Sequence, residues 1–338
     1  MTVNFRLVVA VAIVAIGAEH VARAQVNPRD VPVVTQPQQR FDAGQDIQPI
    51  FEGWTRNDDG SYLFHFGYLN RNYRESPSLP IGQTNYFSPG DEDRGQPTYF
   101  YPRTQRYQFT VLMPAGTGTA AEDGVVWHLT ANGNEQLAYG WLQPEWEIDV
   151  NTITSNGRTG FGRPKDQLFA NGAPLVTISA ATTTARVGEP VTMTASITDD
   201  ELPTPLAPRK PRTRLPALVP PDGAPKAPDN VQWYSKPRPP RNGLSVLWTI
   251  YRGPADATIA PADYQRAVAE EEGDEPGGGR IPGTAPASSE STSLDGDGWT
   301  SARFETTVTF DTPGTYTLRA WASDAMLIVP ADVTVVVQ

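Results

Sequence analysis

Cysteine is absent from the 338 residues of this chain. The absence excludes disulfide bonds, thiol nucleophiles, iron–sulfur clusters, zinc sites built on thiolates and lipid attachment to a cysteine. Small secreted domains of eukaryotes usually carry disulfides. If this chain is exported, its composition is therefore more typical of a bacterial periplasm or cell exterior.

Histidine is scarce as well, with three residues in the chain. His65 and His128 each lie within an expected strand between aromatic or apolar neighbours, where a histidine is more often packed than catalytic. The sequence contains no G-x-S-x-G elbow, no H-E-x-x-H motif and no glycine-rich phosphate loop before a helix. We therefore expect no enzyme activity.

No hydrophobic run is long enough to span a membrane. Residues 7–17 (LVVAVAIVAIG) form an apolar stretch of 11 residues after Arg6, whereas a membrane-spanning helix needs about 20. Ala22-Arg23-Ala24 then supplies the small-x-small pattern that signal peptidase recognises. The pattern predicts a signal peptide over 1–24, a secreted or periplasmic protein and no membrane span in the mature chain. An uncleaved anchor is the alternative.

Acidic residues outnumber basic ones by 38 to 27, so the formal net charge is −11. A net negative surface repels nucleic acid, and we expect no nucleic-acid partner. The apolar share of 38% is low and the 33 prolines are many, which predicts true cores diluted by proline-rich connections. The 8 Trp, 12 Tyr and 12 Phe argue against a disordered chain.

After a flexible leader at 25–45, the pattern predicts an N-terminal β-sandwich domain at 46–150. Two tight hairpins are expected at Asn57-Asp58-Asp59-Gly60 and Asn132-Gly133, because glycine adopts positive φ without steric cost. The connection at 82–102 is long and carries five aromatic residues, which favours a loop that is held in place. The expected strands are 51–54, 62–68, 107–113, 125–131 and 136–142.

A linker is expected at 151–174, because this segment is rich in Gly, Asn and Thr and has no periodicity. A second β-sandwich should follow at 175–338, with a turn at Pro313-Gly314. Its expected strands are 175–181, 190–197, 245–251, 304–310, 316–322 and 331–337.

Three blocks of this second region resemble bacterial PKD-type, immunoglobulin-like repeats: 186–203 (RVGEPVTMTASITDDELP), 244–259 (LSVLWTIYRGPADATI) and 304–337 (FETTVTFDTPGTYTLRAWASDAMLIVPADVTVVV). Glu201 and Ala325 depart from the pattern of the family. The resemblance implies a sandwich that acts as a spacer, adhesive or accessory module. We expect Trp248 and Trp321 to fill the core between its sheets, as aromatics do in sandwiches. The first domain resembles only uncharacterised secreted bacterial proteins.

Two charged insertions interrupt the second sandwich. The proline-rich segment 202–242 holds eight basic and two acidic residues, whereas 262–298 holds nine acidic and two basic residues. In immunoglobulin order both insertions would emerge at the same end of the sandwich. They would then fold against each other or form a charged cap; two independent disordered loops are the alternative.

Two binding hypotheses follow from residue type and position. Asp199, Asp200 and Asp324 supply hard oxygen ligands that could converge at one end of the second sandwich and hold structural calcium; turn formation is the alternative. The aromatic residues in or beside loops of the first domain could stack on a polysaccharide; completion of a small core is the alternative. These aromatic residues are Tyr99, Tyr101, Trp141 and Trp146.

Together these features predict an all-β protein with two immunoglobulin-like β-sandwiches in tandem and a structural or adhesive role at the bacterial surface. Its partner would be a polysaccharide or another surface protein, and no cofactor is expected beyond structural calcium. The alternatives are a carbohydrate-binding module and a glycoside hydrolase that uses paired carboxylates. Carboxylate candidates are Glu52, Glu145, Glu147 and the turn Asp91-Glu92-Asp93.

Overall fold

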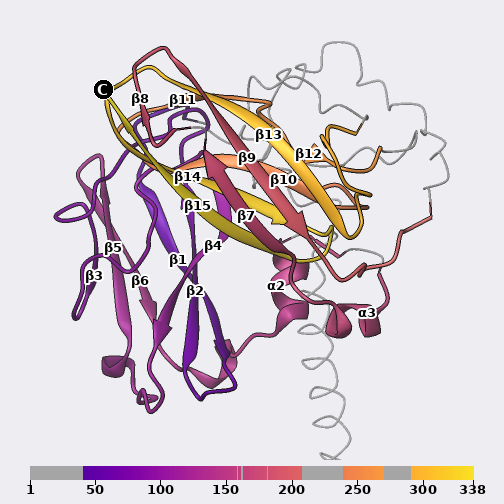
Figure 1. Cartoon of the computed structure of the whole chain (residues 1–338). Coiled ribbons are helices and arrows are strands. Elements are labelled where there is room, and N and C mark those ends of the chain that lie inside the picture. Colours follow the sequence, from indigo (N-terminus) through magenta and orange to yellow (C-terminus); the bar gives the residue numbers. More distant parts are fainter. Residues whose placement is uncertain (1–40, 158, 161–162, 181, 208–238, 270–290) are drawn as a thin grey trace, which may run out of the picture. The chain divides into compact units, whose positions relative to one another are not determined.

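A computed structural model describes residues 41–338 except 158, 161–162, 181, 208–238 and 270–290. The expected signal peptide and residues 25–40 of the expected leader lie outside the described residues. Figure 1 shows that strands are the main regular elements of the described residues. The strands are β1 (Ile47–Arg56), β2 (Tyr62–Asn70), β3 (Asn85–Ser88), β4 (Arg103–Met113), β5 (Val125–Ala131), β6 (Asn134–Gly140), β7 (Leu175–Ala180), β8 (Thr184–Ala185), β9 (Pro190–Thr198), β10 (Ser245–Arg252), β11 (Ala257–Ala260), β12 (Gln265–Arg266), β13 (Ser301–Phe310), β14 (Gly314–Ser323) and β15 (Ile328–Val337).

The first sandwich consists of two three-stranded sheets, β1-β2-β4 and β3-β5-β6. Alternate residues of β2 point inward, and Phe64, Phe66 and Tyr68 are buried there. The ring of Phe66 lies 5.3 Å from that of Phe87 and 6.0 Å from that of Trp127 on the opposite sheet. Aromatic contacts between the two sheets therefore form the core of this sandwich.

Both expected hairpins of the first sandwich are confirmed. Arg56 pairs with Tyr62 across one turn, and Ala131 pairs with Asn134 across the other. Asn132 and Gly133 have φ of 50° and 79°, the left-handed values that a two-residue type I′ turn requires at both central positions. The short strand β3 was not expected, because it lies inside the connection at 82–102.

The second sandwich packs the sheet β12-β10-β14-β15-β8 against the sheet β11-β13-β9-β7. The seven main strands of this sandwich are β7, β9, β10, β11, β13, β14 and β15. The first, second, fourth and fifth of these lie in one sheet, and the third, sixth and seventh lie in the other. This is the strand order of an immunoglobulin-like domain. Buried apolar residues from both sheets form one continuous core. The predicted fold class, all-β with two immunoglobulin-like sandwiches in tandem, is confirmed.

Trp248 and Trp321, the two tryptophans expected in the second core, occupy opposite faces of one sheet. Trp248 is 3% exposed and belongs to the core between the sheets, as expected. Trp321 is equally buried, but it packs with Leu247 and Tyr264 in a separate cluster. Neighbouring residues of a strand face opposite ways, and Ala320 already points into the core. The expected place of Trp321 between the sheets is therefore wrong.

The segment predicted as a linker contains two short helices, α2 (Val150–Gly157) and α3 (Lys165–Ala170), which lie beyond one end of β7 in Figure 1. Two 3-10 turns, η1 (Ala121–Asp123) and η2 (Pro144–Trp146), precede it. Among the described residues, no helix combines the length and the apolar character that crossing a membrane requires.

The described ends of the two insertions meet at one end of the second sandwich, as expected. The amide of Leu244, two residues after the first insertion, donates to the carbonyl of Gly298, the last residue of the second, at 2.9 Å. The start of the acidic insertion is not a loop, because it adds β12 to the five-stranded sheet. Residues 208–238 and 270–290 lie outside the described part, so the pairing of their charges stays a prediction.

Candidate functional site

Each sandwich buries a tyrosine that the other sandwich supplies. Tyr251, on β10 of the second sandwich, is 4% exposed and packs in the core of the first. Tyr99, from the connection between β3 and β4, is also 4% exposed and packs in the core of the second. This reciprocal exchange, which we call the tyrosine junction, joins the two cores.

Hydrogen bonds along β10 hold the tyrosine junction together. The amides of Thr98 and Tyr99 donate to the carbonyl of Tyr251 at 3.1 and 3.3 Å, and the Tyr251 hydroxyl donates to the carbonyl of Gly95. The amide of Ile250 donates to the Tyr101 hydroxyl at 2.9 Å. The aromatic connection at 82–102 is thus held in place as predicted, and it is held against the second sandwich.

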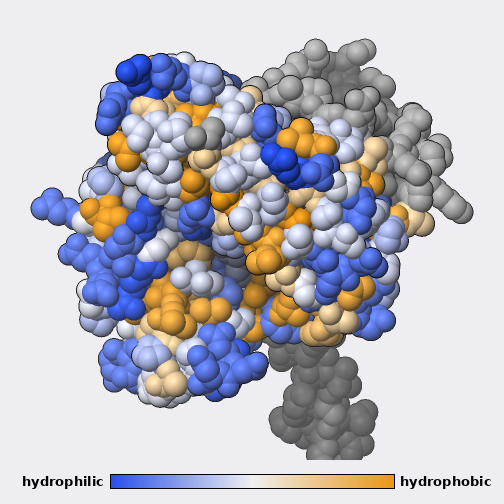
Figure 2. Space-filling view, in the orientation of Figure 1, coloured by the Kyte–Doolittle hydropathy of each residue, from blue (hydrophilic) through white to orange (hydrophobic). Residues whose placement is uncertain are grey.

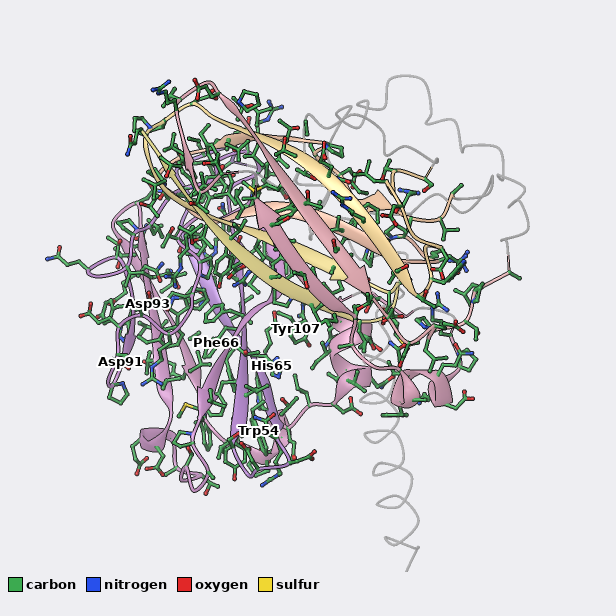
Figure 3. All side chains as sticks on the ribbon, viewed as in Figure 1. Trp54, His65, Phe66, Asp91, Asp93 and Tyr107 are labelled. Atoms are coloured by element: carbon green, nitrogen blue, oxygen red, sulfur yellow. The ribbon has the colours of Figure 1, made fainter. Side chains whose placement is uncertain are left out.

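Two arginines of the second sandwich reach across to the first. The two Nη atoms of Arg252 donate to Asp93 at 2.8 and 2.7 Å, and these bonds hold the Asp93 pKa below its usual range. Arg319 donates to both carboxylate oxygens of Asp332 at 2.6 and 2.7 Å, and its third nitrogen donates to the carbonyl of Gln108 at 2.7 Å. Asp93 is labelled in Figure 3 and lies on the loop that follows β3.

The four aromatics proposed to bind polysaccharide lie in two places. Tyr99 is buried and Tyr101 is partly buried, and their rings pack edge to face against each other at the second core. Trp141 is half-buried, and Trp146 is 42% exposed while stacking on Phe51 at 5.6 Å. Of the four, Trp146 retains the exposure that stacking on a sugar requires.

The three aspartates proposed to bind calcium meet at one end of the second sandwich. Asp324 is 3% exposed, and burial raises its pKa to about 6. Burial also raises the pKa of Asp199 to about 7, and the negative charges of Asp324 and Asp200 add to this effect. The negative charges of these aspartates therefore act on one another, and their convergence on a calcium ion stays a prediction.

Hydrogen bonds already occupy much of this acidic cluster. Asp324 accepts the amides of Met326 and Leu327 at 2.6 Å each and the Asn171 side chain at 2.7 Å. Asp200 accepts the amides of Gly172 and Leu202 at 2.9 and 3.0 Å. No group of three or more His, Asp or Glu side chains suited to a metal occurs among the residues that the structure describes. Turn formation is observed, and calcium binding stays a prediction.

Glu52 is enclosed on the sheet of the first sandwich. It occupies a bulge of β1, and its side chain is 2% exposed. Burial raises its pKa to about 7, although Arg106 lies 3.0 Å away and opposes the rise. Glu145 and Glu147 are exposed. A glycoside hydrolase needs two carboxyl groups on either side of a substrate, and the enclosed Glu52 leaves no such access.

His65 is a packed residue, as expected. Burial lowers its pKa to about 4, and its Nε2 lies 3.0 Å from Thr55 Oγ1. Its ring lies edge-on to Tyr107 at 6.1 Å, and Figure 3 shows both residues on the β1-β2-β4 sheet. The imidazole is therefore neutral at pH 7.

The outer face of the β3-β5-β6 sheet holds an arrangement that sequence reasoning missed. Ser88 Oγ lies 2.9 Å from His128 Nε2, and His128 Nδ1 lies 3.1 Å from Glu135 Oε1. The three side chains come from three neighbouring strands. Their separations of 40 and 7 residues form no local motif, so only the register of the strands reveals the line of hydrogen bonds.

Comparison with protein-family models and with curated proteins finds no match. Among solved structures, the chain is similar to the D00–D0 domain of intimin, with a TM-score of 0.22, 10% identity and coverage of 86% of this chain and 99% of that one. It is also similar to domains 4 and 5 of the S-layer protein SbsC, with a TM-score of 0.19, 9% identity and coverage of 87% and 98%. FdeC, an Escherichia coli adhesin, gives a TM-score of 0.20, 12% identity and coverage of 88% and 64%. Scores this low carry no argument, and the fold class rests on the strand order of this chain.

Proposed function

We propose that this chain is a secreted or periplasmic protein with a structural or adhesive role at the bacterial surface. The observation that carries the proposal is the tyrosine junction, in which Tyr99 and Tyr251 are exchanged between two cores. A spacer or adhesive module must hold a binding surface at a fixed distance under load. Two sandwiches that share core residues meet that need better than two sandwiches on a flexible linker.

Cell fractionation tests the location on which this role depends. When a bacterium produces the full chain, mass spectrometry of the periplasmic and external fractions should find a product that begins at Gln25. Recovery of the unprocessed chain in the cytosol would contradict both the export signal and the role. We also propose that residues 175–338 form a PKD-type repeat, and the sequence resemblance of 186–203, 244–259 and 304–337 supports this.

A carbohydrate-binding module is the second candidate, and exposed aromatic rings favour it. Trp146 is 42% exposed and Tyr139 is 61% exposed. Hydrophilic residues cover most of the face in Figure 2, and apolar residues gather there in several small patches. Pull-down on insoluble polysaccharides, with and without calcium, should show saturable binding that Trp146→Ala weakens. Leu112→Ala is the matched control, since Leu112 is 63% exposed but has no ring; equal loss in both variants would reject stacking.

A further inference from the structure

We propose that Ser88 is an activated nucleophile that reacts with carboxylic esters, with His128 as its general base and Glu135 as a positioning residue. Ser88 Oγ lies 2.9 Å from His128 Nε2, and His128 Nδ1 lies 3.1 Å from Glu135 Oε1. A hydroxyl within hydrogen-bond reach of a base, which a third group orients in turn, defines nucleophilic catalysis by serine on unrelated folds. The proposal goes beyond the structural role and opposes the expectation of no enzyme activity.

The surroundings of His128 fix the tautomer that the reaction needs. A carboxylate accepts hydrogen bonds, so Glu135 selects the form that carries a proton on Nδ1. Nε2 is then free to accept the hydroxyl proton of Ser88. Tyr86 stacks on the imidazole at 4.3 Å with an interplanar angle of 9°, which holds the plane of the ring. The imidazole is thus oriented from both its edge and its face.

The guanidinium of Arg94 places a positive charge next to the carbonyl of Pro89, the residue that follows Ser88. Pro89 has no amide hydrogen, so the next residue cannot supply the backbone donor of an oxyanion site. Arg94 Nη2 donates to the carbonyl of Pro89 at 2.9 Å, and Arg94 Nε is buried with no hydrogen-bond partner among the described residues. The buried Nε faces the protein, so Arg94 would favour the negative oxygen that forms when Ser88 attacks through its nearby positive charge and not through a direct hydrogen bond.

The reaction proceeds in two steps, acylation of Ser88 and hydrolysis of the acyl-serine. Ser88 Oγ bonds to the ester carbonyl carbon while its proton passes to His128 Nε2; the bond to the alcohol oxygen then breaks, and the alcohol leaves with that proton. Water next attacks the acyl-serine through the same base, which releases the carboxylic acid and restores Ser88.

The exposure of this face defines the class of substrate. The Glu135 side chain is 51% exposed and Tyr139 is 61% exposed. A small molecule would not be enclosed here as it is in a concave pocket. The face instead fits an ester group carried on a large molecule, such as an acylated polymer, which can lie along the sheet.

A fluorophosphonate probe tests the nucleophile without knowledge of the natural ester. The folded chain should be labelled on the peptide that contains Ser88, as mass spectrometry would show, and Ser88→Ala should abolish this label. His128→Gln should slow labelling by about 100-fold or more, the usual contribution of a general base. Ser61→Ala is the matched control, because the Ser61 hydroxyl donates to Asp59 at 2.6 Å and bonds to no histidine. In this variant the probe should label Ser88 at the same rate as in the unmodified chain.

The role of Glu135 has its own readout. Glu135→Ala should slow labelling, and Glu135→Gln, which keeps a side-chain oxygen that can accept from His128 Nδ1, should restore part of the rate; a purely structural role would give the two variants the same rate. Circular dichroism and thermal unfolding establish that each variant is folded. Absence of a label on Ser88 in the folded chain, or equal labelling in His128→Gln, would overturn the proposal.

Discussion

The guanidinium carbon of Arg319 lies 3.3 Å from the centroid of the Tyr251 ring. The stacked pair places a charge of the second sandwich against the aromatic ring that this sandwich inserts into the first. Cation–π contacts of desolvated arginines contribute about 2 kcal/mol or more. The Arg319 side chain is 9% exposed, so the contact belongs to the interior of the tyrosine junction and strengthens it.

Removal of Arg319 should destabilise the chain markedly. Arg319→Ala loses two bonds to Asp332, the bond to the carbonyl of Gln108 and the stack on Tyr251. We expect a fall of about 3 kcal/mol in the free energy of unfolding, mainly from the desolvated stack on Tyr251 and the buried bond to the Gln108 carbonyl, because the Asp332 side chain is itself 39% exposed. Urea denaturation followed by circular dichroism measures this fall.

Asp93→Asn is the comparison for that variant. It breaks the Arg252–Asp93 ion pair, which joins the two sandwiches, but the Asp93 side chain is 47% exposed, and exposed pairs contribute about 0–1 kcal/mol. A loss as large as that of Arg319→Ala would show that exposure does not decide the strength of these contacts.

The main strands and both hairpins of the fold could be predicted because their information is local. Period-two alternation in β2 and the turn chemistry of Asn132-Gly133 depend only on neighbouring residues. The tyrosine junction could not be predicted in this way. The amide of Gly253 donates to the hydroxyl of Thr98, a residue 155 positions away in the sequence. Aromatic content alone predicts that Tyr99 is buried, but it does not predict which of the two cores Tyr99 enters.

Asp199 should make the chain less stable as pH rises. Its pKa is raised from 3.8 to about 7 in the folded state, so the folded chain binds more protons than the unfolded chain over that range. The contribution of Asp199 to stability is therefore fully present below pH 3.8 and is lost as pH rises to about 7. Asp199→Asn should flatten the dependence of the unfolding midpoint on pH between 4 and 7 and raise the midpoint at pH 8.

Calcium provides the complementary test of the same cluster. An ion bound by Asp199, Asp200 and Asp324 would raise the unfolding midpoint at pH 8, and Asp199→Asn would remove this rise. No rise at millimolar calcium would leave the cluster as a set of turn-forming carboxylates.

Ionisation of Glu52 should lower the stability of the fold as pH rises, as ionisation of Asp199 does. Its pKa is raised from 4.5 to about 7 by burial, so ionisation above pH 4.5 weakens the fold. His65 acts in the opposite direction, because burial lowers its pKa from 6.5 to about 4 and stability is lost as pH falls through that range. Glu52→Gln, compared with the unmodified chain at each pH, isolates the carboxyl: the variant should gain stability relative to the parent between pH 5 and 8. If the difference in stability between Glu52→Gln and the parent did not change with pH, the raised pKa of Glu52 would be contradicted.

Hydrogen exchange during urea titration tests the central claim, that the tyrosine junction makes the two sandwiches one cooperative body. Mass spectrometry would follow the amides of β5 in the first sandwich and β13 in the second. Tyr251→Ala should lower the protection of both strands by about 3–5 kcal/mol, because it removes a buried ring from the first core and the ring on which Arg319 of the second sandwich stacks. Tyr264→Ala is the control, since Tyr264 is buried outside the tyrosine junction. Both strands should lose protection at the same urea concentration; if β13 opens while β5 stays protected, the sandwiches are independent and the account is contradicted.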